Sequence, residues 1–271
     1  MFDTIIRGAT VIDGTGAQGF TADVAITDGT IAEIGKVAGQ AHRVIDADGA
    51  ILTPGFIDIH THYDGQFVWD EELEPSFSNG TTTAIAGNCG VGFAPVREQL
   101  RRPLIELMEG VEEIPGIVLE EGLDWQWTSF PDYLDRIERN RFTMDVATHL
   151  PHAPLRVFVM GERALNHEMA TAEDIEQMKQ HVRMSMAAGA IGVSGSRILE
   201  HRSSTGDHVP GTFAEEAEML GLASAMGESG RGVFQVVPLG AGGSSGGTPA
   251  SMEERMSEHR RIERIAEASG R

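Results

Sequence analysis

The segment GFIDIHTHYDG, residues 55–65, places two histidines one residue apart at the end of an apolar run. Its first part, residues 55–62, has the composition of a short β-strand, in which alternate side chains lie on the same face. We therefore expect His60 and His62 to point to one side of a sheet, where both can reach one cation. Neutral imidazole is the commonest side-chain ligand of metals such as zinc, iron and nickel. The competing interpretation is a chance pair of exposed histidines at a strand end.

The residues before this segment have the character of a β domain. Three stretches within residues 2–54 are rich in β-branched side chains, and Asp28-Gly29 lies between two expected strands, which is a hairpin signal. We predict that residues 1–54 form a small antiparallel sheet and that the next domain begins at Gly55.

The residues after the segment alternate between short apolar strands and helical stretches. This alternation implies a parallel sheet with helices packed on it, so we expect an α/β fold over residues 55–271. The predicted strands are residues 55–62, 81–87, 144–152, 189–196 and 232–237, and the predicted helices are residues 94–110, 128–140, 171–189, 212–230 and 251–270.

Local signals mark several helix ends. Ser251 with Glu254 forms a capping box, and Thr171 with Asp174 resembles one. Glycine commonly ends a helix because it adopts the left-handed backbone conformation without strain. The expected helix stops are Gly189, Gly230 and Gly270.

Composition restricts the function classes. The chain has 271 residues, a net charge of −20 and one cysteine. An acidic chain without a basic stretch is a poor candidate for binding nucleic acid or an anionic membrane. No apolar run reaches the roughly 18–20 residues that span a bilayer, and the N-terminus lacks a signal-peptide pattern. One cysteine forms no internal disulfide, so we expect a cytoplasmic protein. Its oligomeric state, a homo-oligomer included, stays open.

Two motifs carry a family resemblance. The stretch TPGFIDIHTHYDG (53–65) resembles the opening of the metal-dependent amidohydrolase superfamily, and GNCG (87–90) resembles its D-aminoacylase branch, the N-acyl-D-amino-acid deacylases. The resemblance covers essentially the whole chain. It implies a TIM-like (β/α)8 barrel beside a β-sandwich built from flanking residues. Residues 55–271 would then hold about five of the eight barrel units, and residues 1–54 would be part of the sandwich.

The resemblance also implies metal-dependent hydrolysis of amide bonds. The first barrel strand would supply His60 and His62, and Cys89 would bind the metal where many relatives use a carboxylated lysine. A thiolate favours zinc, so we expect zinc, as one or two divalent ions, to polarise the substrate carbonyl and activate water. Without the resemblance, a lone cysteine is more often a small buried hydrophobic residue.

The expected reaction is hydrolysis of the acyl–nitrogen bond of an N-acyl amino acid, with a D-configured substrate as the specific expectation. Two alternatives stay open. One is a cyclic amidase of the hydantoinase or dihydroorotase type, which GNCG in place of a strand-borne lysine disfavours. The other is a non-catalytic scaffold protein with the amidohydrolase fold.

The chain departs from the family pattern in two ways. Gln235 stands where the fifth barrel strand of the better-known acylases brings a metal-binding histidine, so the ligand set differs, or a second metal is weak or absent. The sixth-strand histidine and the eighth-strand aspartate, the usual proton shuttle, would lie after residue 271. We therefore assign no catalytic residue within the chain. We expect the chain to be the N-terminal part of a longer enzyme and inactive alone, the alternative being a self-contained five-stranded sheet.

Three further residues are candidates for substrate binding. His152 is the last residue of the third predicted strand, and Arg197 and His201 follow the fourth. An arginine there could hold a substrate carboxylate through two parallel hydrogen bonds, although a structural histidine or a surface salt bridge is the competing interpretation. The glycine-rich residues 239–249 would form a flexible loop or lid after the fifth strand.

Overall fold

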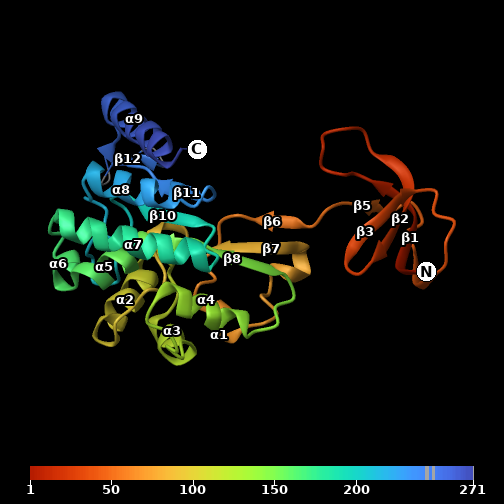
Figure 1. Ribbon diagram of the computed structural model, residues 1–271, viewed down its shortest axis with the longest axis horizontal. Helices are drawn as coiled ribbons and strands as arrows, with labels where there is room; N and C mark the ends of the chain where they lie inside the picture. Colours follow the sequence, from red (N-terminus) through yellow and green to blue (C-terminus); the bar gives the residue numbers. More distant parts are fainter. Residues whose placement is uncertain (242–243, 246–247, 271) are drawn as a thin grey trace. The chain divides into compact units, whose positions relative to one another are not determined.

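The structure, a computed structural model, describes residues 1–241, 244–245 and 248–270 (Figure 1). The chain divides into two compact units, Met1–Phe56 and Ile57–Arg271, each with its own hydrophobic core. Within the described residues, no helix has both the length and the apolar character needed to cross a membrane.

The first unit is one five-stranded sheet. Its strands are β1 (Phe2–Val11), β2 (Phe20–Thr27), β3 (Thr30–Gly35), β4 (Ala41–Asp46) and β5 (Ile51–Leu52), in the order β3-β2-β1-β4 with β5 beside β1. Asp28 and Gly29 both have positive φ, 50° and 69°, and form the tight turn of the β2–β3 hairpin. The predicted hairpin is therefore confirmed.

The prediction of an antiparallel sheet is wrong for the last two strands. β1 pairs antiparallel with β2 but parallel with β4 and β5. Between β3 and β4 the chain buries Val37 against Ile5 and Ala25. Burial of this apolar side chain favours a connection that crosses the sheet and not a tight hairpin. After such a crossover, β4 enters the sheet parallel to β1.

Six strands that follow one another along the chain form two sheets in the second unit. They are β6 (Phe56–Asp58), β7 (Thr81–Ala86), β8 (Asp145–Thr148), β9 (Leu150–Pro151), β10 (Gly192–Ser196) and β11 (Val233–Val237). One sheet has the order β6-β7-β8, visible side by side in Figure 1, and the other has the order β11-β10-β9. The pairs β7–β8, β9–β10 and β10–β11 are parallel, as predicted. The predicted strand 144–152 is interrupted at His149, so it becomes β8 and β9.

The predicted strand 55–62 is shorter than expected, because β6 ends at Asp58. The Asp58 carboxylate accepts a hydrogen bond from the His60 backbone N–H at 3.1 Å. A short polar side chain that binds nearby backbone in this way competes with strand pairing. Both predicted metal-binding histidines therefore lie just beyond the strand, where Thr61 still donates its backbone N–H to the Ile85 carbonyl at 2.9 Å.

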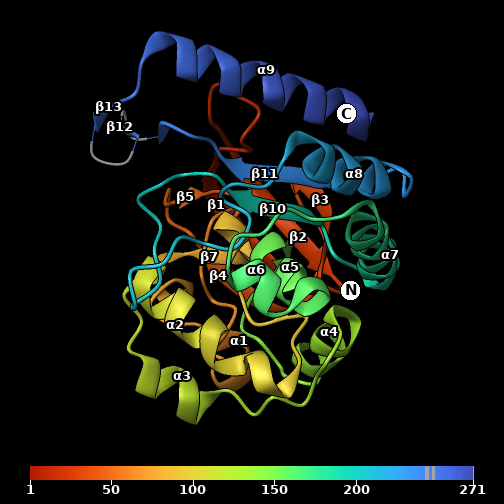
Figure 2. The same ribbon diagram turned by 90° about the vertical axis from the view of Figure 1, so that its left-hand side faces the viewer.

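Nine α-helices are described in the second unit, together with three short 3-10 helices. The α-helices are α1 (Gln66–Trp69), α2 (Arg101–Glu112), α3 (Gly116–Gly122), α4 (Phe130–Glu138), α5 (His152–Met160), α6 (Glu162–Leu165), α7 (Ala172–Ala188), α8 (Glu216–Gly227) and α9 (Met252–Ser269). The five predicted helices correspond to α2, α4, α7, α8 and α9. α5 was not predicted, and it contains Pro154, which a helix tolerates only in its first turn. α8 packs between α7 and α9 (Figure 2).

The predicted helix ends are mostly confirmed. Both capping boxes form, with Thr171 and Ser251 each accepting from the backbone N–H three residues later. Gly189 and Gly270 cap α7 and α9. Gly230 does not end α8, which stops at Gly227 and is followed by a turn held by the Ser229 hydroxyl.

The region after β11 is described only in part. Ser244–Ser245 (β12) and Thr248–Pro249 (β13) pair as a short antiparallel hairpin. Residues 242–243 and 246–247 of the predicted flexible loop lie outside the described residues.

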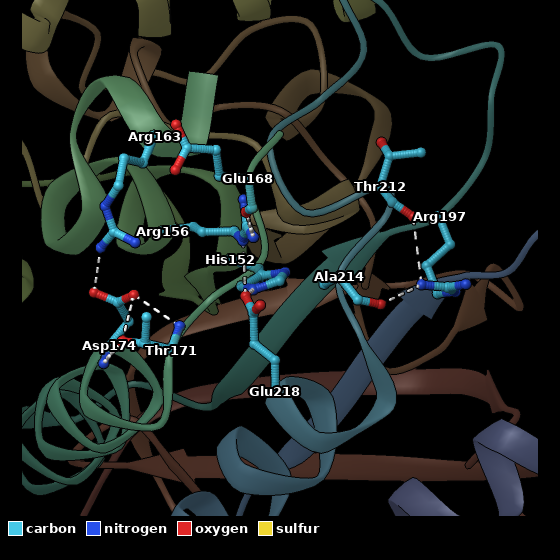
Figure 3. A network of polar contacts seen from close by, with 10 residues as sticks. All are labelled: His152, Arg156, Arg163, Glu168, Thr171, Asp174, Arg197, Thr212, Ala214 and Glu218. Carbon is cyan, nitrogen blue, oxygen red and sulfur yellow. Dashed lines mark hydrogen bonds and ion pairs between the residues drawn. The ribbon is translucent and has the colours of Figure 1, made fainter. Parts of the chain in front are cut away.

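A buried ionic network joins α5 to α8 (Figure 3). Glu218 Oε1 lies 2.7 Å from His152 Nε2 and accepts a hydrogen bond from Arg156 Nε at 2.9 Å. The three side chains are 1–2% exposed. Arg156 also donates to the Glu168 carbonyl at 2.6 Å. Because a buried charge without its partner is costly, removing the carboxylate should weaken the fold more than removing any exposed ion pair.

We expect Glu218→Gln to lower the free energy of unfolding by about 3–5 kcal/mol, because Arg156 would keep a buried charge without its counter-ion. The matched variant Glu228→Gln removes a 50% exposed carboxylate that pairs with Arg183, and should cost about 1 kcal/mol or less. Urea denaturation measures both. Equal losses would contradict the role given to the network.

Candidate metal centre

Three predicted metal ligands come together at the ends of β6 and β7. His60, His62 and Cys89 each offer a ligand atom, and these atoms lie within 4.8 Å of one another. His60 Nε2 is 3.2 Å from Cys89 Sγ, and the two imidazole rings are 5.4 Å apart between centroids. Two nitrogens and one sulfur at this spacing form a donor set suited to zinc.

The turn that carries Cys89 has an unusual backbone. Asn88–Gly90 forms a short 3-10 turn in which Cys89 has φ 54°, a left-handed conformation that non-glycine residues rarely adopt. Gly87 and Gly90 flank it, also with positive φ. A Cβ at Gly87 would overlap the His149 carbonyl oxygen, and a Cβ at Gly90 would lie 2.9 Å from Gly195 Cα. Both positions require glycine, because the turn lies directly against β10 and the junction of β8 and β9.

Hydrogen bonds from three other segments hold this strained turn in place. Gln235 Oε1, on β11, accepts from the Cys89 backbone N–H at 3.2 Å. Ser194 Oγ, on β10, accepts from the Gly90 N–H at 3.1 Å. The buried Asn88 side chain donates to the Thr61 carbonyl at 3.1 Å. The surrounding structure therefore determines where the thiol lies, as strained residues at functional sites require.

Burial controls the charge of the ligands in the absence of metal. It raises the pKa of the Cys89 thiol to about 12, with further contributions from Glu112 and Asp64. Burial also lowers the pKa of His62 to about 4, assisted by His60 and His201. Near neutral pH the imidazole of His62 is thus neutral and ready to bind a cation, whereas the thiol must release its proton on binding.

Three further titratable residues lie near the cluster, in addition to the predicted ligands and substrate residues. Burial raises the pKa of Asp64 and of Glu112 to about 7 each, and burial together with His60 lowers the pKa of His149 to about 4. Within the described residues, His62 Nδ1, Asp64 Oδ2 and His149 Nδ1 are buried without a hydrogen-bond partner. Unpartnered buried nitrogen atoms are costly, and a bound cation at the cluster would satisfy that of His62.

The sequence itself draws attention to two of these residues, Asp64 and Glu112. Asp64 follows His62 by two residues in the opening segment. Glu112 lies in an acidic run at the end of a helix, where a negative charge is unfavourable because the helix dipole is itself negative there.

The three predicted substrate residues have different surroundings. His152 belongs to the buried network with Glu218. Arg197 is 9% exposed and donates to Glu258 Oε1 at 2.6 Å. It also donates to the Ala214 carbonyl at 3.0 Å (Figure 3). Both therefore have buried partners within the protein, and substrate contact by either stays a prediction.

His201 is the predicted substrate residue beside the cluster. Its ring is partly buried, with Nδ1 3.1 Å from Ser196 Oγ. It interacts electrostatically with His60 and His62. Its contact with substrate also stays a prediction.

Comparison with known proteins gives a consistent family match. The model of the amidohydrolase family Amidohydro_3 matches residues 43–268. The D-aminoacylase of Alcaligenes xylosoxydans xylosoxydans is 34% identical over 194 residues, which cover 71% of this chain and 37% of that protein.

Comparison with solved structures gives the same family match. A D-aminoacylase structure described as defining a novel subset of amidohydrolases superposes with a TM-score of 0.76 at 28% identity, covering 100% of this chain and 50% of that one. An N-acyl-D-glutamate deacylase from Bordetella bronchiseptica, complexed with zinc and a phosphonate inhibitor, superposes with a TM-score of 0.75 at 29% identity, covering 99% and 50%. The chain thus spans half the length, or less, of these proteins.

An L-hydantoinase from Arthrobacter aurescens is more distant. It superposes with a TM-score of 0.56 at 15% identity, covering 100% of this chain and 51% of that one. At that identity the likeness concerns the fold alone.

We expect Gly87→Ala to destabilise the protein by about 2–5 kcal/mol, combining about 1–2 kcal/mol for a left-handed Cβ with about 1–3 kcal/mol for overpacking against the His149 carbonyl. The matched control is Gly270→Ala, because Gly270 has nearly the same backbone angles but open space around it. It should show only the first of these costs. Thermal unfolding of both variants measures the difference, and a Gly87→Ala variant no less stable than the control would refute the close approach.

Proposed function

The chain belongs to the amidohydrolase family, and from this premise we propose that it carries the metal site of an N-acyl-D-amino-acid deacylase-like hydrolase. The reaction is hydrolysis of the carbon–nitrogen bond between an acyl group and a small amino acid. The observation that carries the proposal is the convergence of His60, His62 and Cys89 within 4.8 Å.

The proposed ion is zinc, as one or two divalent cations. Two imidazole nitrogens and one thiolate match the ligands that zinc prefers, and three protein ligands leave a position for substrate or water. The buried, unpartnered Nδ1 of His62 supports the fit. When bound, such an ion supplies Lewis-acid activation of the substrate carbonyl and of a water molecule.

The surrounding residues keep the ligands in place for that chemistry. Gln235 and Ser194 fix the backbone on either side of the thiol, so Cys89 needs no rearrangement to bind. The family resemblance implies a metal-binding histidine on β11. Gln235 stands in that place and instead binds the Cys89 backbone. We assign no proton-transfer residue within residues 1–271.

The substrate class follows from the relatives. Those most similar here are named for the hydrolysis of D-configured N-acyl amino acids, whereas the hydantoinase likeness supports only a common fold. We therefore favour a linear N-acyl-D-amino acid over a cyclic amide. Of the predicted substrate residues we retain His201, because it lies beside the cluster and is only partly buried.

We also propose that β6 to β11 and their helices are part of a TIM-like barrel, and that residues 1–54 are part of a β-sandwich. Parallel pairing in chain order supports the first assignment. A cytoplasmic location is proposed because the only cysteine is a candidate metal ligand that needs a reduced thiol.

The ligand assignment predicts that the purified wild-type chain contains stoichiometric zinc and that His60→Ala and Cys89→Ala lose it. The control is His259→Ala, which removes a 64% exposed histidine of α9 and should retain the metal. Elemental analysis after removal of loosely bound ions measures the content. A Cys89→Ala variant with full metal would show that the thiol is not a ligand.

The substrate assignment predicts that protein expressed from the complete reading frame encoding these residues hydrolyses N-acetyl-D-amino acids faster than their L-enantiomers. Hydantoins and dihydroorotate should be poor substrates, because the favoured relatives act on linear amides. A panel of these compounds under zinc-replete conditions tests the proposal. Preferential opening of a cyclic amide would reject it in favour of the cyclic amidase, and inactivity of folded, metal-free protein would favour the scaffold.

A further inference from the structure

We propose that residues 198–211, which follow β10 and are called the β10 loop below, form a fixed wall of the metal site that presents His201 to the substrate. Ser196, Arg197 and Gly110 are positioning residues, because they hold this loop without belonging to the metal cluster. The inference rests on the proposed function, because it assigns part of the substrate site to a segment outside the ligand set.

The end of β10 lies against the turn that carries Cys89. Ser194 Oγ accepts from the Gly90 N–H at 3.1 Å, so one face of β10 contacts this turn. Ser196 lies on the same face, because alternate residues of a strand point to one side. A Cβ at Gly90 would lie 3.1 Å from the Ser196 backbone nitrogen. The β10 loop therefore begins directly beside the metal cluster.

The His201 side chain is fixed to that end of β10. Its Nδ1 lies in a hydrogen bond of 3.1 Å with Ser196 Oγ, and Ser196 is the only hydrogen-bond partner of this ring among the described residues. The hydroxyl is buried, whereas the imidazole is only partly buried. An imidazole has a second ring nitrogen that can form a hydrogen bond. Ser196 thus limits the rotation of the ring and leaves Nε2 for a substrate.

Arg197 fastens both ends of the β10 loop. Its guanidinium precedes the loop and donates to the carbonyls of Thr212 and Ala214, which follow it, at 3.3 and 3.0 Å (Figure 3). The same side chain donates to Glu258 Oε1, on α9, at 2.6 Å. The Arg197 backbone N–H donates to the Val237 carbonyl, at the end of β11, at 2.8 Å. One buried residue therefore ties the two ends of the loop to each other and to two further elements.

The middle of the loop is docked on α2 at a glycine. A Cβ at Gly110 would overlap the Arg202 carbonyl oxygen and the Ser203 carbonyl carbon. The Ser204 N–H donates to the Glu106 carbonyl of the same helix at 2.8 Å. Glycine is a poor helix former, and this close approach of the loop backbone explains its presence inside α2.

Further contacts keep the shape of the loop. The Ser203 N–H donates to the Asp207 carbonyl at 2.8 Å. Near the other end, Gly211 has φ 104°, and a Cβ there would lie 2.7 Å from His152 Nδ1. A loop held at both ends and in the middle has little freedom left to lose when a substrate binds. These anchors favour a fixed wall over a lid.

The first experiment measures kcat and KM for an N-acetyl-D-amino acid, using zinc-loaded protein expressed from the complete reading frame. His201→Ala should raise KM about 10-fold, the loss of one hydrogen bond, with zinc content retained. Ser196→Ala should raise KM less. The double variant should be no worse than His201→Ala alone, because Ser196 acts through His201. The control His259→Ala removes an exposed histidine of α9 and should leave KM unchanged.

The second experiment tests the anchors by hydrogen exchange. Gly110→Ala should abolish protection of the Ser204 amide and raise KM more than it lowers kcat. The matched control is Gly221→Ala in α8, where the nearest atoms to an added Cβ belong to side chains, and it should do neither. Arg197→Lys keeps the charge but lacks the planar fork that reaches several acceptors, so it should raise exchange across the β10 loop.

Each outcome bears on a separate part of the inference. An unchanged KM in His201→Ala would overturn the substrate contact, and additive effects of the two single variants would overturn the role of Ser196. Wild-type exchange at the Ser204 amide in Gly110→Ala would overturn the docking on α2. Wild-type protein that cleaves no N-acyl-D-amino acid would reject the proposed function with the His201 contact, while exchange still decides whether the loop is fixed. Should Gly110→Ala fail to fold, Arg197→Lys still tests the anchoring.

Discussion

The candidate site depends on the absence of side chains at Gly87 and Gly90. Without a Cβ at these positions, the turn at Cys89 can lie against the His149 carbonyl and against Gly195. That close approach lets Ser194 and Gln235 bind the turn from two different strands. The thiol is thereby held near two histidines that are 27 and 29 residues away in the sequence, and the left-handed strain at Cys89 is offset by fixed hydrogen bonds.

Local patterns in the sequence were sufficient to predict much of the secondary structure of the second unit. The capping boxes of α7 and α9 and the parallel strands β7, β10 and β11 were predicted from nearest-neighbour signals, because capping and side-chain alternation depend on a few adjacent residues. His60, His62 and Cys89 were also identified, although the reasoning about strand geometry was incomplete. β6 ends at Asp58, so the histidines meet through the bonds of Asp58 and Thr61 and not through regular strand alternation.

Features that depend on distant contacts could not be predicted. The parallel placement of β4 follows from the burial of Val37 against the sheet, and the partner of His152 is Glu218, 66 residues away. Arg197 similarly pairs with Glu258 across 61 residues. Glu112 reaches His62 from the end of α2. No periodicity encodes which buried polar groups meet, because such pairing is decided by the packing of whole elements.

We infer above all that the turn at Cys89 brings a thiolate and two imidazoles to a single ion. X-ray absorption spectroscopy at the zinc edge of the zinc-loaded chain tests it most directly, because sulfur and nitrogen scatter differently and lie at different distances. We expect one sulfur at about 2.3 Å together with nitrogen or oxygen ligands at about 2.0–2.1 Å. A ligand shell of nitrogen and oxygen alone would contradict it.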